Sequence, residues 1–75
     1  MNYNYGGDEY IEVMSSHSFN GDPVLRRIKK SIIKTITQHK DAKGEQYVSI
    51  WVEGESFYFH GTMEEFDKAY KTVFI

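Results

Sequence analysis

The side chains best suited to acid–base or metal chemistry are scattered along this sequence. Its three histidines, His17, His39 and His60, fall in a loop, near the end of an expected helix and in an expected strand. Metal sites commonly take close pairs of ligands, and the chain has no cysteine to complete a set. Ser16 and Ser18 flank His17 without an orienting carboxylate or an oxyanion site. We therefore expect neither a metal site nor a serine nucleophile.

The paired carboxylates do not suit catalysis either. Glu53 and Glu55 flank a turn in water, and Glu64 and Glu65 begin a helix, so neither environment suits acid–base catalysis. A chain of 75 residues also leaves little room for a ligand pocket of about 300 Å³. We expect no catalytic residue, no cofactor and no small-molecule substrate, and thus no enzyme.

Residues 46–60 are predicted to form a β-hairpin with two distinct faces. Strand side chains alternate between faces, so a two-residue turn at Gly54-Glu55 determines which residues share a face. A turn at Glu53-Gly54 would shift the pairing by two and keep the same faces, whereas a three-residue loop would mix them and is disfavoured. The expected apolar face contains Val48, Ile50, Val52, Phe57 and Phe59. The expected aromatic and polar face contains Tyr47, Ser49, Trp51, Glu53, Ser56, Tyr58 and His60.

The segment that precedes the hairpin is predicted to form a basic amphipathic helix. Asp22 supplies an N-cap oxygen and Pro23 fits the first helical position. An apolar stripe follows at spacings of three and four, and basic residues project from the opposite side. The stripe is Leu25, Ile28, Ile32 and Ile36, and the basic side is Arg26, Arg27, Lys30 and Lys34. Residues 31–37 are rich in β-branched side chains, which leaves a strand as the alternative there.

The two ends of the chain complete the expected fold. Residues 1–7 are expected to be a mobile arm, and residues 8–15 alternate as a strand with Ile11 and Val13 on its apolar face. Thr62 and Glu65 form a capping box that begins a second helix, which we expect to run almost to Ile75. The predicted fold is a single α+β domain over 8–75, in the order β-α-β-β-α, with both helices packed on one face of a three-stranded sheet.

Composition limits the functional classes. The net charge is −2, which argues against general nucleic-acid binding, although the basic residues cluster within 22–43. The sequence has no apolar run long enough to span a membrane and no signal-peptide pattern. The absence of cysteine suits a reducing compartment, and we expect a soluble cytoplasmic protein.

The outer face of the sheet is the best candidate for a functional surface. We expect one aromatic patch there, formed by Tyr10, Met14, Tyr47, Trp51, Tyr58 and His60. Tyrosine and tryptophan dominate interface energies, so the patch indicates a protein partner, either a host protein or a second copy in a homodimer. The alternative is nucleic-acid binding through Arg26, Arg27, Lys30 and Lys34. Short, cysteine-free, aromatic-rich chains with divided charge also resemble small accessory proteins of bacteriophages and mobile elements, which would imply an inhibitor of a host protein.

Overall fold

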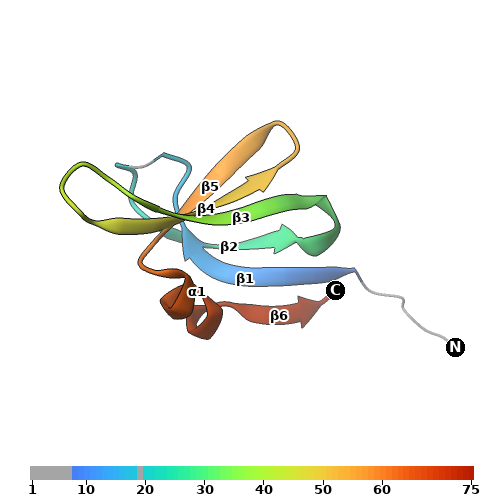
Figure 1. Ribbon diagram of the computed structural model, residues 1–75. Coiled ribbons are helices and arrows are strands. Elements are labelled where there is room, and N and C mark those ends of the chain that lie inside the picture. Colours follow the sequence, from blue (N-terminus) through green and yellow to red (C-terminus); the bar gives the residue numbers. More distant parts are fainter. Residues whose placement is uncertain (1–7, 19) are drawn as a thin grey trace, which may run out of the picture.

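The computed structural model describes residues 8–18 and 20–75, so the arm expected over residues 1–7 lies outside the described residues. In the described part, six strands form two antiparallel sheets, accompanied by one short α-helix (Figure 1). The strands are β1 (Glu9–Ser15), β2 (Val24–Lys29), β3 (Ile33–Lys40), β4 (Gln46–Val52), β5 (Glu55–His60) and β6 (Lys71–Phe74), and the helix is α1 (Met63–Ala69). The prediction of one sheet covered by two helices is therefore wrong.

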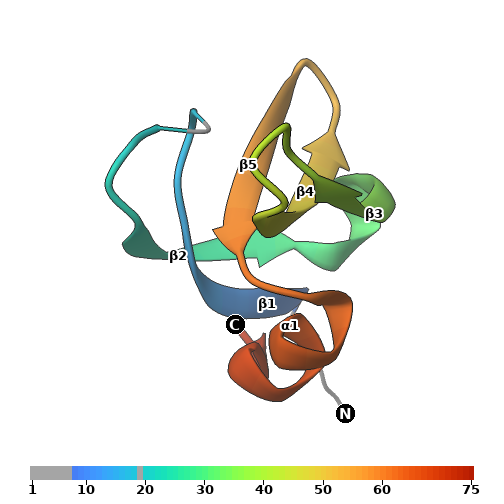
Figure 2. The ribbon, with the colours of Figure 1, turned by 60° about the vertical axis from the view of Figure 1, so that its left-hand side comes forward.

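Each sheet has three strands. Sheet A has the order β2-β1-β6, and sheet B has the order β3-β4-β5. The sheets meet where the end of β1 approaches β5, because the backbones of Ser16 and Tyr58 exchange two hydrogen bonds of 2.9 and 2.8 Å. Figures 1 and 2 show the β4–β5 hairpin on the opposite side of the molecule from α1 and β6.

The predicted basic helix is replaced by two strands. Strand β2 pairs with β1, a short 3₁₀ turn η2 (Lys30–Ile32) follows, and β3 pairs with β4. β-branched residues are common in this segment and favour extended backbone, so the strand considered as the alternative for residues 31–37 is the correct one from Ile33 onward. Leu25 and Ile28 accordingly lie on opposite faces of β2, so Ile28 is buried whereas Leu25 is 63% exposed. Asp22 and Pro23 precede a strand and cap no helix.

The C-terminal helix begins as predicted and ends early. The Glu65 backbone N–H donates to Thr62 Oγ1 over 3.1 Å, and the Thr62 N–H donates to Glu65 Oε1 over 2.8 Å, which completes the capping box. The helix stops at Ala69, because the next residues form β6 along the second edge of β1. The expectation that it runs almost to Ile75 is wrong.

The predicted hairpin and the division of its side chains between two faces are confirmed. The turn lies at Glu53-Gly54, the second of the two registers considered, so that Ile50 pairs with Phe57 and Ser49 with Tyr58. Gly54 has φ +82°, a left-handed conformation that glycine adopts without a Cβ penalty. The apolar side chains of β4 face inward and are buried.

The core lies between the two sheets and beneath α1. Its buried members are Ile11, Val13, Ile28, Val48, Ile50, Val52, Phe57 and Phe66. Phe66 brings α1 onto the core, where its ring meets Phe59 edge to face with centroids 5.4 Å apart. Because α1 packs on this inner side, the outer side of sheet B is left for contact with solvent or a partner.

Candidate functional site

The candidate site is the outward side of sheet B, here called the aromatic face. Strand register and alternation place side chains from β3, β4 and β5 on this face. Strands β4 and β5 are the predicted hairpin, whereas β3 had been assigned to a helix. The aromatic face consists of Thr35, Thr37 and His39 from β3, Tyr47, Ser49 and Trp51 from β4, and Ser56, Tyr58 and His60 from β5.

A buried serine lies at the centre of the aromatic face. The Ser49 side chain points outward, yet the residue is only 1% exposed because larger side chains cover it. The Trp51 indole N–H donates to Ser49 Oγ over 3.0 Å, and His39 Nε2 lies 2.8 Å from the same oxygen. A hydroxyl offers one donor and two acceptor positions, so it can serve both neighbours at once. This arrangement fixes the indole while leaving Trp51 46% exposed.

The rings of the aromatic face pack against one another across the strands. His39 and Tyr47 are stacked with centroids 5.0 Å apart, and Tyr47 meets Tyr58 in a tilted contact at 5.9 Å. The Ser56 hydroxyl donates to the Tyr58 hydroxyl over 3.2 Å. Together, the ring contacts across the strands and this hydrogen bond within β5 restrict side-chain rotation before any partner arrives.

Two serine–histidine contacts in this region invite a catalytic interpretation, and the geometry argues against it. Ser49 is 1% exposed, and its hydroxyl already accepts from the indole N–H of Trp51, so a substrate cannot reach it. Ser16 Oγ lies 3.4 Å from His60 Nε2, but Ser16 is 1% exposed and its hydroxyl donates to the Ser18 carbonyl over 2.8 Å. An activated nucleophile needs a base that accepts its proton and an open path to the substrate. We interpret both contacts as structural.

The structure divides the predicted patch between two surfaces. Tyr47, Trp51, Tyr58 and His60 lie on the aromatic face, whereas Tyr10 and Met14 belong to β1 in sheet A. Met14 pairs with Leu25, and both side chains are exposed on the outer side of sheet A. A single patch of six residues is therefore not formed.

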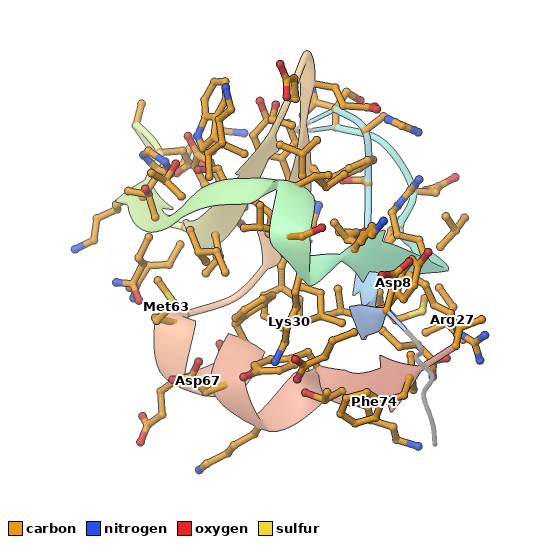
Figure 3. All side chains as sticks on the ribbon, turned by 90° about the vertical axis from the view of Figure 1, so that its right-hand side faces the viewer. Asp8, Arg27, Lys30, Met63, Asp67 and Phe74 are labelled. Carbon is orange, nitrogen blue, oxygen red and sulfur yellow. The ribbon has the colours of Figure 1, made fainter. Side chains whose placement is uncertain are left out.

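The four predicted basic contact residues are also separated. Arg26 faces inward, with its Nε donating to Ser15 Oγ over 2.9 Å and its guanidinium 4.7 Å from the centroid of the Phe57 ring. Arg27 faces outward and pairs with Glu12 at 2.9 Å. Figure 3 shows Arg27 at the rim of sheet A, on the same side as Asp8.

Lys30 and Lys34 lie beyond the end of β2. Lys30 pairs with Glu9 at 2.9 Å, and Lys34 sits at the register shift in β3. The basic residues thus form no continuous stripe, which removes the geometric basis for phosphate-backbone binding along one helix.

A cleft continues from one end of the aromatic face. It has a volume of about 550 Å³ and lies between the loop that precedes β2 and the adjoining ends of β4 and β5. Tyr47 and His60, a cross-strand pair of the aromatic face, form part of its wall. The remaining lining residues are Asn20, Gly21, Asp22, Pro23, Glu45 and Gln46. The sequence analysis missed this cleft, because Asp22 had been assigned to a helix cap and Glu45 had no assigned role.

Among residues 8–18 and 20–75, histidines and carboxylates form no group of three or more that could hold a metal ion. In the same part of the chain, no helix has the length and apolar character needed to cross a membrane.

Comparisons with models of protein families, with curated proteins and with solved structures all found no match to this chain. The functional interpretation therefore depends on the geometry and chemistry of its own residues.

Proposed function

We propose that this protein is a small non-enzymatic protein-binding module whose contact surface is the aromatic face. The observation that carries the proposal is an exposed indole held in one orientation: Trp51 is half-exposed, while its N–H is tied to buried Ser49. Tryptophan and tyrosine contribute most to binding when they enter a pocket on a partner. Side chains already fixed in place lose little conformational entropy on binding.

The neighbours of Trp51 support the same proposal. Tyr47 and Tyr58 extend the contact area across two strands, and Thr35 and Thr37 add small polar groups on β3. A central aromatic cluster with a polar surround is the usual composition of a specific interface. The contact of α1 with the inner side of the sheet leaves this surface available.

The proposal can be tested with a displayed library of random twelve-residue peptides selected on the immobilised protein. We expect the selected peptides to lose affinity by about tenfold or more on Trp51→Ala, since truncating a central aromatic anchor costs at least 1.4 kcal/mol in typical interfaces. Phe74→Ala is the matched control, because Phe74 is an aromatic residue with 71% exposure on β6, away from the aromatic face. Circular dichroism melts confirm that both variants fold.

Two results would contradict the proposal. One is the selection of peptides that bind the Trp51→Ala variant as tightly as the unmodified protein. The other is an equal loss of affinity with Phe74→Ala, which would place the contact outside the aromatic face.

A further inference from the structure

The cleft beside the aromatic face is lined by acidic side chains, which indicates the charge of the partner. Asp22 and Glu45 contribute two carboxylates to its lining, and no lysine or arginine is among the residues that line it. A second cleft of about 360 Å³ adjoins it through Asn20 and Glu45 and adds Asp41 and Lys43. The two clefts together therefore present three carboxylates and a single ammonium group.

Backbone alternation extends the negative charge along the aromatic face. Glu45 directly precedes β4 and Glu53 directly follows it. Glu45 has the same parity as Tyr47, Ser49 and Trp51 and lies on their side of the sheet, and Glu53 lies in the turn at the other end of this column. The Asp41 N–H donates to the Glu45 carbonyl over 2.8 Å, which continues the ladder beyond the named strands. The aromatic column is thus bounded by a carboxylate at each end.

We propose that the aromatic face binds a basic, arginine- or lysine-bearing segment of a protein partner, with one cationic side chain in the cleft between Asp22 and Glu45. This inference rests on the proposed function and specifies the chemistry of the partner. A guanidinium in the cleft would meet carboxylates and the ring of Tyr47, and arginine binds favourably to both carboxylates and aromatic faces. Opposite charge on the partner also speeds association and excludes acidic competitors.

The same carboxylates disfavour two other partners for this surface, a second copy of the chain and a nucleic acid. A second copy of the chain in a symmetric contact would bring its own Glu45 and Glu53 against the same carboxylates, because an isologous interface pairs identical patches. A nucleic acid would bring phosphates to a surface edged by carboxylates. Each of these occupants meets like charge, whereas a basic peptide meets opposite charge.

The test uses a capped tetra-arginine peptide as the probe, titrated into isotopically labelled full-length protein and followed by backbone amide NMR shifts. We expect the largest shifts at residues that line the cleft, such as Gly21, Gln46 and His60. A capped tetraglutamate peptide of the same length should give no saturable shifts. Self-association appears in the same experiment as shifts that depend on protein concentration without peptide.

A charge-matched pair of double variants separates the cleft from general electrostatic attraction. Asp22→Asn with Glu45→Gln should weaken tetra-arginine binding by about fivefold or more, since two exposed ion pairs are removed. Glu64→Gln with Asp67→Asn makes the same change in net charge on α1 (Figure 3), at two residues that do not line the cleft, and should leave the affinity within about twofold.

The outcomes distinguish this inference from the proposed function. Equal weakening by the two double variants, or shifts centred on α1, overturns the basic-partner inference. Peptides from the displayed library provide an independent readout: if they depend on Trp51 but carry no excess of arginine and lysine and ignore Asp22→Asn with Glu45→Gln, the inference fails and the proposed function stands. If the probe depends on Asp22 and Glu45 while library peptides ignore Trp51→Ala, the proposed function fails at its contact surface.

Discussion

At the scale of single residues, the buried hydroxyl of Ser49 holds two side chains of the aromatic face in place. Ser49 is covered on all but 1% of its surface, and it is hydrogen-bonded to Trp51 and close to His39. The alternation pattern correctly placed Ser49 on the same side as Trp51. It could not show the burial of Ser49, because burial depends on the rings of neighbouring strands folding over it.

Ser49→Ala should therefore cost more than an ordinary surface substitution. Removing the hydroxyl leaves the indole N–H and the imidazole nitrogen without this partner, at an expected cost of about 1–3 kcal/mol in the free energy of unfolding. Urea denaturation measures the change, and Trp51 fluorescence reports the altered indole environment. Ser31→Ala is the control, because Ser31 is exposed on the 3₁₀ turn and should stay within about 0.5 kcal/mol. Equal midpoints for the two variants would show that Ser49 does not anchor the surface.

Two isoleucines that pair across β3 and β4 also differ in burial. Ile50 is fully buried, whereas its cross-strand partner Ile36 on β3 is 37% exposed. Ile50→Ala should destabilise the protein by about 2–5 kcal/mol, because it leaves a cavity in the core. Ile36→Ala removes the same atoms from a partly exposed position on an edge strand and should cost about 1–2 kcal/mol. Denaturant midpoints compare the two, and a larger cost at Ile36 would mean that β3 is packed differently.

At the scale of elements, patterns that depend on near neighbours were predicted and those that depend on distant pairing were not. The hairpin and the start of α1 follow from residues within a few positions of one another, namely the alternation around Gly54 and the Thr62–Glu65 box. The β2–β3 segment changes phase at η2 and shifts register between Ile33 and Thr35, so a regular period of two never develops. Strand β6 has four residues and forms by pairing with β1 far away in sequence.

The helix start offers a test at this scale. Thr62→Ala removes the hydroxyl that accepts from the Glu65 N–H and should cost about 1 kcal/mol. Thr62→Ser keeps that oxygen and should retain most of the stability, which makes it the matched control. Thermal melts of both variants give the difference. If serine and alanine destabilise equally, the loss arises from the Thr62 methyl group and the cap contributes little.

At the scale of the whole molecule, the two sheets share one core and are joined at a corner near β1 and β5. The composition indicated a small domain, and the hairpin pattern indicated the inner face of sheet B. Sheet A was not predicted, because its edge strands β2 and β6 had been assigned to helices. The same error combined Tyr10 and Met14 with Trp51 in a single patch. The residues of the aromatic face were grouped correctly only where the grouping depends on the hairpin itself.

Two adjacent arginines on β2 allow the stability contributed by a contact between the sheets to be compared with that of an exposed ion pair. Arg26 bridges the sheets, since its Nε donates to Ser15 on β1 and its guanidinium lies over Phe57 on β5. Arg27 lies on the other side of the strand in an exposed pair with Glu12. Arg26→Ala should lower the free energy of unfolding by about 1–3 kcal/mol, because it leaves the Ser15 hydroxyl buried without that donor and uncovers Phe57. Arg27→Ala should cost about 1 kcal/mol or less, as is usual for exposed ion pairs.

Urea titrations followed by both tryptophan fluorescence and circular dichroism measure the two changes, and coincident transitions are expected because the sheets share a core. A larger loss for Arg27→Ala, or an Arg26→Ala variant as stable as the unmodified protein, would show that the sheets are held together elsewhere.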